Sequence, residues 1–248
     1  MDHGQAVEDQ IAAYRAREPY KIITNAGGNE QLHITEQPPI EIAVLAGEIL
    51  YQLRSALDHL FFEVVRRAHP GPMSKGLIKA CHFPILTKSP TGFNPPIPKD
   101  KLFPRGELYR WVPDPAYTFI EGWQPYYGVH DRRKLLGMLH EFSNIDKHRR
   151  LNTVVTLIDR KDTRVFAGGF SSTAITPFLN HGAELMEPWH PVLDAGPTPV
   201  DVKREFIPMV AFDEPELGPP QTALIDEVIH ELPLVVFTIR IGFQQFLD

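Results

Sequence analysis

Apolar residues recur every three or four positions in two long stretches of the 248-residue chain. The first stretch runs from Ile40 to Ala68 and the second from Asp131 to Lys147. This spacing predicts two amphipathic helices, each with one apolar face directed at a core. A third helix is predicted from Thr222 to Leu247, with a kink or a break near Glu231 because Pro233 lies inside it.

Apolar and polar residues alternate in several shorter stretches, which predicts β-strands. After a short helix at Ala6–Arg17, the runs Tyr20–Thr24 and Leu32–Thr35 flank a turn-forming segment and predict a β-hairpin. Four later runs predict an antiparallel meander, and these are Leu151–Ile158, Arg164–Phe170, Ala183–Met186 and Val200–Phe212. A turn over Asp159–Thr163 would join the first two of them.

Residues 71–128 are rich in proline, glycine and aromatic residues, which predicts a long ordered excursion with short strands such as His82–Leu86 and no long helix. The patterns together predict an α+β fold with a core of long antiparallel helices, an antiparallel β-meander and this Pro-rich excursion between the two motif helices. We expect one domain over 1–248. Within it, 1–39 would form the N-terminal helix and hairpin, 40–150 the helical region, and 151–248 the meander and C-terminal helix.

Composition narrows the class of protein further. Cys81 is the only cysteine, so neither an intrachain disulfide nor a cysteine-cluster zinc site is possible within one chain, and a reducing compartment is indicated. The N-terminal segment is polar, and the most apolar run, Leu234–Ile241, is much shorter than the roughly 20 residues of a membrane helix. We therefore expect a soluble, cytoplasmic protein without a membrane association.

Charge is unevenly distributed along the chain. The net charge of −6 argues against bulk nucleic-acid binding. Residues 131–150 nevertheless carry six basic and three acidic side chains, whereas acidic residues predominate over 184–231. This asymmetry would steer an anionic ligand to one face, or it is an ordinary solvated helix surface.

The first polar motif is the cluster Arg54, Ser55, Asp58 and His59 on the first long helix. Arg54 and Asp58 are an i,i+4 pair on the side of the helical wheel opposite to the predicted apolar stripe, and Ser55 and His59 are a second such pair on one flank. Arg54 and His59 lie about 140° apart. The cluster is either part of a site or a polar face with a surface ion pair.

The second polar motif ends the second long helix, and it contains Glu141, Asn144, Asp146, Lys147, His148 and Arg149. If the helix continues, Asp146 and Arg149 extend its apolar stripe toward the core, where unpaired charges are costly. Alternatively the helix ends near Ile145 and the cations stabilise its C-terminus, or Asp146 and Arg149 form a structural pair. Because both long helices carry an Asp, a His and an Arg within a few residues, we favour convergence in one site.

These motifs resemble the paired signatures of a widespread, poorly characterised bacterial protein family. The resemblance rests on GEILYQLRSALDHL (Gly47–Leu60) and NIDKHRRL (Asn144–Leu151), with HFPI (His82–Ile85) and QPY (Gln124–Tyr126) as further matching pieces. It covers about half of the chain.

The Arg-x4-His spacing of Arg54 and His59 is also similar to that of HEPN domains, which are helical, usually dimeric proteins. Many of them are metal-independent ribonucleases of toxin and defence systems. This resemblance implies that Arg54 binds the scissile phosphate and that His59 is a general acid or base. It further implies RNA as a ligand, a homodimer, and a protein partner from a defence or toxin system. Ser55 departs from the pattern, since Asn, Asp or His usually follows the arginine.

The sequence leaves a catalytic and a non-catalytic hypothesis open. In a metal-independent ribonuclease without a cofactor, Arg54 would act with His59 and His148 as the acid–base pair. The residues that would bind or orient the substrate are Asp58, Ser55, Asn144, Asp146, Lys147 and Arg149. In a non-catalytic or ligand-binding protein, the same motifs would form a buried polar network that fixes the helices in register.

A third hypothesis is a metal-dependent hydrolase or oxygenase in the helical core. Its ligands would be Glu48, His59, Glu141 and His148, which are ligand types on two helices. The Glu-x-x-His pairs of di-iron bundles are absent from both helices. We therefore rank this hypothesis below the other two.

Overall fold

The computed structural model describes residues 3–90, 92–105, 107–127, 131–148, 151, 153–165, 170–179, 183, 200–212 and 225–247. The chain divides into two compact units. We name residues 1–43 with 152–225 the sheet unit, and residues 44–151 with 226–248 the helical unit. Each unit combines segments from both halves of the chain, and the single domain over 1–248 stays a prediction.

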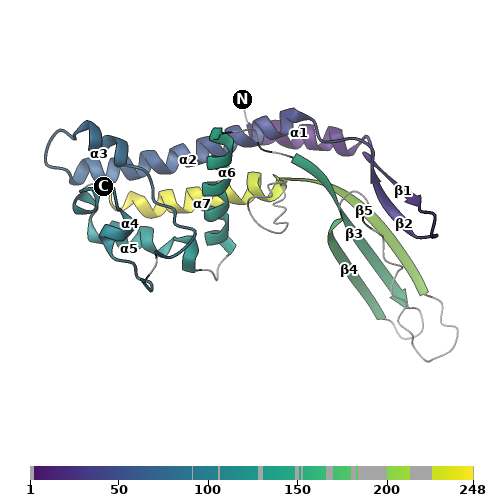
Figure 1. Ribbon diagram of the computed structural model, residues 1–248. Helices are drawn as coiled ribbons and strands as arrows, with labels where there is room; N and C mark the ends of the chain where they lie inside the picture. The colour runs from purple at the N-terminus through teal and green to yellow at the C-terminus, as the bar shows by residue number, and fades with distance from the viewer. Residues whose placement is uncertain are drawn as a thin grey trace. The chain divides into compact units, whose positions relative to one another are not determined.

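The sheet unit begins with α1 (His3–Arg15) and the predicted hairpin (Figure 1). Strand β1 (Tyr20–Thr24) pairs antiparallel with β2 (Glu30–Ile34). The turn between them is held by the Asn25 side chain, whose Oδ1 accepts hydrogen bonds from the backbone N–H groups of Gly27 and Asn29 at 2.9 Å each. The turn-forming composition of this segment therefore has a direct physical cause.

The second sheet of this unit is antiparallel and has the strand order β4-β3-β5. Its strands are β3 (Thr153–Val165), β4 (Phe170–Leu179) and β5 (Val200–Phe212). Strand β5 pairs with β3 rather than with β4, its predecessor in the chain. The predicted turn over Asp159–Thr163 is wrong, because these residues lie inside β3 and pair on both sides. Backbone pairing on two edges overrides the turn-like composition. Ala183 is not in a strand, and the rest of the predicted strand to Met186 lies outside the described residues.

The helical unit is built on three long helices, and their bounds agree closely with the prediction. These are α2 (Ile40–Ala68, whose first four residues belong to the sheet unit), α6 (Asp131–His148) and α7 (Ile225–Gln244). Helix α7 continues through Pro233, which corrects the expected break. Helices α2 and α7 run in the same direction, so this pair departs from the predicted antiparallel arrangement (Figure 1). In the part of the chain that the structure describes, no helix is long and apolar enough to cross a membrane.

The Pro-rich excursion between α2 and α6 is ordered and contains only short helices. They are α3 (Lys75–Ala80), α4 (Lys99–Leu102), η1 (Leu108–Trp111), α5 (Asp114–Gly122) and η2 (Pro125–Tyr127). The segment His82–Leu86, which was predicted as a short strand, is extended but pairs with no strand among the described residues.

An aromatic cluster joins the excursion to α2 and α7. The Phe61 ring of α2 stacks on Phe103 at 5.5 Å and meets Phe83 edge-on at 6.5 Å. Phe83 in turn lies 6.0 Å from Phe243 of α7. All four rings are buried, and burial of each contributes roughly 2–3 kcal/mol. This cluster fixes the excursion, and with it the segment after Cys81, against the long helices.

Candidate functional site

Arg54 and Asp58 lie on the buried side of α2, which corrects the predicted helical wheel. That wheel centred the apolar stripe between Leu45 and Leu53, but both of these residues are only partly buried. The fully buried stripe instead includes Leu50, Leu57 and Phe61. Apolar residues of several types cover more than half of this helix, so the packing of the neighbouring segments, and not the periodicity alone, decides which side is the core.

The Arg54–Asp58 pair holds the backbone of Phe83. Arg54 Nη2 donates a hydrogen bond to the Phe83 carbonyl oxygen at 2.7 Å, and Asp58 Oδ1 accepts one from the Phe83 N–H at 2.9 Å. Arg54 Nη2 and Asp58 Oδ1 are 3.0 Å apart, with side chains 12% and 25% exposed. Burial lowers the pKa of Arg54, and the adjacent Asp58 carboxylate opposes that shift. The motif is therefore a partly buried polar clamp on the HFPI segment.

Gln124, in the QPY piece, holds the same segment from the other end. Its side chain is fully buried. Its Oε1 accepts a hydrogen bond from the Leu86 N–H at 2.8 Å, and its Nε2 donates to the carbonyl oxygens of Pro84 and Ile120 at 3.0 Å each. Side chains thus satisfy the backbone groups that strand pairing would otherwise satisfy, which is why an extended segment exists here without a sheet.

The second motif meets α2 at Gly47. A Cβ atom at Gly47 would lie only 2.6 Å from Asp146 Oδ1, so glycine is what allows the Asp146 carboxylate to reach the backbone of α2. Burial raises the pKa of Asp146. The side chains of Lys147 and His148, and all of Arg149, lie outside the described residues, and so does the predicted Asp146–Arg149 pair.

His59 occupies a different side of α2 from Arg54. It lines a groove of about 460 Å³ between α2 and α7, together with Leu60, Phe237 and Arg240 among others. Twelve residues separate His59 from the crossing at Gly47, or about 18 Å along the helix. The described contacts therefore bring Asp146 to Gly47 and not to His59.

The remaining predicted residues are dispersed. Ser55 and Glu141 are partly buried, and Glu48 is exposed. Asn144 is exposed and contacts the imidazole of His140, with 3.1 Å between Asn144 Nδ2 and His140 Nε2. Within the described ranges, no group of three or more His, Cys, Asp or Glu side chains is arranged to hold a metal ion.

Arg54 also lines a cavity of about 230 Å³ that the sequence did not predict. Its polar side chains are Arg54, His82, Arg105 and His140, and we name it the basic cavity. The rest of its wall is largely apolar and includes the extended segment Phe83–Leu86. Among the described residues that line it, none is acidic. The clamp on Phe83 therefore shapes one wall of a site with basic side chains.

The polar groups of the basic cavity differ in how they are held. Arg54 Nη1 is buried and has no hydrogen-bond partner among the described residues. His82 Nδ1 lies 3.2 Å from Asp58 Oδ2, so one carboxylate contacts both Arg54 and His82. Arg105 is exposed and makes no ion pair within the described part of the chain. The cavity thus combines a positioned arginine, an exposed arginine and a carboxylate-oriented imidazole.

Sequence reasoning missed His82, Arg105 and His140 as site residues. They come from three separate parts of the helical unit, and only packing brings them to one cavity. Two weak signals were present. His82 opens the HFPI piece, and His140 precedes Asn144 by one helical turn.

Comparison of the chain with protein-family models, curated proteins and solved structures found no match. The indication of a function therefore comes from the chemistry of the basic cavity. Guanidinium groups bind the oxygens of phosphate and carboxylate groups, and apolar walls strengthen such contacts by excluding water. An imidazole held by a carboxylate is a suitable proton acceptor or donor near neutral pH.

Proposed function

We propose that the helical unit binds a small ligand through an anionic, phosphate-like group in the basic cavity. The observation that carries the proposal is the gathering of Arg54, His82, Arg105 and His140 around one cavity, with no acidic side chain among the described residues that line it. Arg54 lines the cavity, and its buried Nη1 has no hydrogen-bond partner among the described residues, so the guanidinium has donor capacity that the protein does not use there. In this proposal, the first motif builds the wall of a binding site and supplies one of its contacts.

The polar network supports binding because it makes the cavity rigid before a ligand arrives. Asp58 fixes Arg54 and His82 at once, and Gln124 fixes the opposite end of the same wall. A site whose side chains are already ordered loses less conformational entropy when it binds. This proposal develops the ligand-binding alternative that the sequence left open.

The test is isothermal titration of the full chain with inorganic phosphate. Wild type should bind phosphate, and Arg105→Gln should weaken binding by about tenfold or more, the size of a charge-assisted hydrogen bond. His140→Gln should weaken it as well. Arg66→Gln is the matched control, because Arg66 pairs with Glu63 on the exposed surface of α2 and does not line the cavity. Absence of phosphate binding, or equal binding by all four proteins, contradicts the proposal.

A second candidate, a metal-independent ribonuclease, is favoured by the Asp58–His82 contact beside a second histidine. In this candidate, His82 accepts the proton of the ribose 2′-OH, and that oxygen attacks phosphorus. The bond from phosphorus to the 5′ oxygen breaks, and His140 donates a proton to the leaving oxygen. Arg54 and Arg105 stabilise the charge on the phosphorane. This assignment uses His82 and His140, whereas the HEPN-like assignment uses His59 and His148.

Cleavage of a labelled RNA in the presence of EDTA separates these assignments. If His82 and His140 are the acid–base pair, His82→Ala and His140→Ala each lower the cleavage rate by about 100-fold or more, and His59→Ala does not. Loss of cleavage in His59→Ala and His148→Ala alone would favour the HEPN-like site instead. No cleavage by wild type discards both ribonuclease assignments and leaves the binding proposal standing.

A further inference from the structure

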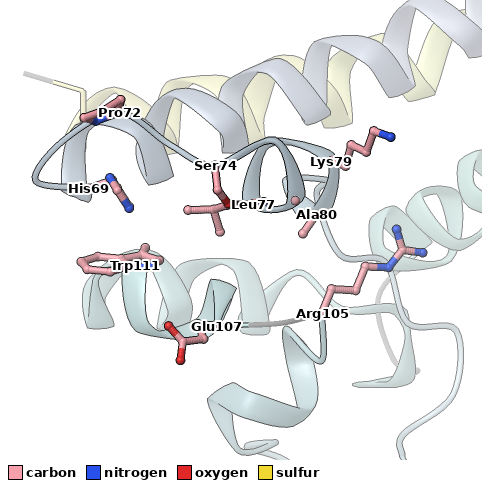
Figure 2. A pocket seen from close by; sticks show the side chains of 10 residues that line it. His69, Pro72, Ser74, Leu77, Lys79, Ala80, Arg105, Glu107 and Trp111 are labelled. Atoms are coloured by element: carbon pink, nitrogen blue, oxygen red, sulfur yellow. Dashed lines mark hydrogen bonds between the residues drawn. The ribbon is translucent and has the colours of Figure 1, made fainter.

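A second, larger cavity of about 660 Å³ adjoins the basic cavity in the helical unit (Figure 2). Its volume is in the range of roughly 300–1,000 Å³ that is typical of small-molecule sites. The two cavities share Ala80 and Arg105 as lining residues. We name the larger one the aromatic cavity, and its further lining residues are His69, Pro72, Ser74, Gly76, Leu77, Lys79, Glu107 and Trp111.

The aromatic cavity is chemically different at its two ends. The rings of His69 and Trp111 lie at one end, with their centroids 4.5 Å apart. The cationic side chains Lys79 and Arg105 lie at the other end (Figure 2). An aromatic group would be favoured at the first end by stacking, and an anionic group at the second by charge. This arrangement fits a ligand that carries one aromatic group and one anionic group.

His69 is held in a defined orientation at the aromatic end. Its Nδ1 lies 2.8 Å from the carbonyl oxygen of Gly71 and 3.3 Å from the backbone nitrogen of the same residue. Both contacts use Nδ1, so Nε2 is the ring nitrogen that can face a ligand, as a donor or as an acceptor according to the tautomer. A ring nitrogen in either role can pair with the polar edge of an aromatic base.

Glu107 lies between Trp111 and Arg105 along the same wall (Figure 2). Its Oε1 accepts a hydrogen bond from Arg110 Nη1 at 2.7 Å, which offsets its charge and orients it. A carboxylate repels phosphate but is a good acceptor for the vicinal hydroxyls of a ribose. The order along the wall is therefore aromatic ring, hydroxyl acceptor and cation.

We infer that the two adjoining cavities bind a mononucleotide, with the base at His69 and Trp111, the ribose at Glu107, and the phosphate at Arg105 and the basic cavity. This inference rests on the proposed binding of an anion in the basic cavity and adds the class of ligand. It places the shared residue Arg105 at the junction of sugar and phosphate. Lys79 supplies a second cation at the same end as Arg105.

The test compares inorganic phosphate, ribose 5-phosphate and adenosine 5′-phosphate by titration of the full chain. Adenosine 5′-phosphate should bind about tenfold tighter than ribose 5-phosphate, the typical contribution of one stacked base. Trp111→Leu should remove that difference and leave phosphate binding within about twofold of wild type. Trp111→Phe keeps an aromatic ring and is the milder change, so it should retain most of the affinity difference between the two ligands. Trp123→Leu is the matched control, because Trp123 contacts Phe119 and does not line either cavity.

The outcomes separate the inference from the proposed function. If phosphate binds but adenosine 5′-phosphate binds no tighter than ribose 5-phosphate, the mononucleotide inference is overturned and anion binding stands. Tighter nucleotide binding that is the same in Trp111→Leu and Trp111→Phe also overturns it, because the base then lies elsewhere. If phosphate itself does not bind to wild type, the proposed function fails and the inference falls with it.

Discussion

Asp58 is the residue on which most of the described site depends. Its two carboxylate oxygens contact the Arg54 guanidinium, the Phe83 N–H and the His82 imidazole. An exposed ion pair contributes little to stability, but a partly buried carboxylate with three partners leaves several groups unsatisfied when it is removed. Arg54 and Asp58 also belong to the first polar motif, so a structural role accounts for at least part of that motif.

Replacement of Asp58 by alanine should therefore destabilise the protein by roughly 2–4 kcal/mol, because Arg54 and the Phe83 N–H lose their partner away from bulk water. Chemical denaturation followed by circular dichroism measures this difference. Arg66→Gln, which breaks only the exposed Glu63–Arg66 pair, should leave the stability almost unchanged. Equal stability of the two variants would show that the clamp on Phe83 contributes nothing.

Cys81 illustrates how burial limits chemistry at a neighbouring position. The thiol lies directly before His82 and invites a nucleophile role by its position in the sequence. Its side chain is buried, and burial raises the pKa of the thiol to about 11. A thiol that stays protonated at neutral pH is a poor nucleophile. Cys81 therefore belongs to the packing beneath the cavity wall.

At the scale of elements, the crossing of α2 and α6 depends on one small residue. Glycine inside a helix usually costs about 1 kcal/mol relative to alanine. Gly47 is nevertheless required, since its missing side chain leaves room for the Asp146 carboxylate. The end of α6 can lie this close to α2 only where α2 has no side chain.

Gly47→Ala should lower the stability of the wild-type chain by roughly 1–2 kcal/mol, because the new methyl group overlaps Asp146. In an Asp146→Ala background the same change should raise stability by up to about 1 kcal/mol, the usual helix propensity of alanine. Gly76→Ala on α3 is a control, since its nearest neighbour would be 3.9 Å away. A gain of the same size at Gly47 in both backgrounds would refute the close contact.

The elements were predictable to different degrees, and the reasons are physical. The ends of α2 were predicted correctly because prolines precede it and the residues after Ala68 cannot continue a helix. The interior of β3 was not predicted correctly, because a run of charged residues indicates a turn when its pairing partners are unknown. The predicted core side of α2 was wrong for a similar reason. The periodicity shows that the helix has apolar faces, but the neighbouring segments decide which of these faces is buried.

The site was less predictable than the elements. Arg54 and Asp58 were identified from their spacing, but His82, Arg105 and His140 belong to no common motif in the sequence. Their proximity depends on the path of the Pro-rich excursion, which irregular backbone and side-chain hydrogen bonds determine. Conversely, His59 follows Arg54 closely in the sequence but faces the groove toward α7. Sequence neighbours on a helix can thus serve different surfaces.

At the scale of the molecule, the helical unit places its polar side chains where the excursion meets the long helices. The aromatic cluster and the Arg54–Asp58 and Gln124 contacts hold the excursion, and the two adjoining cavities open along it. Loops held by a rigid scaffold are common locations for binding sites. Function is therefore expected at the excursion and not at a groove between helices alone.

The most direct test of this account is an NMR titration of the full chain with inorganic phosphate, observed at the imidazole Cε1–H signals. These signals are assigned by single His→Gln variants. The account predicts that the His82 and His140 signals shift with one common binding constant while the His59 signal stays in place. A titration in which His59 and His148 shift and His82 and His140 do not, or in which no imidazole responds, would contradict it.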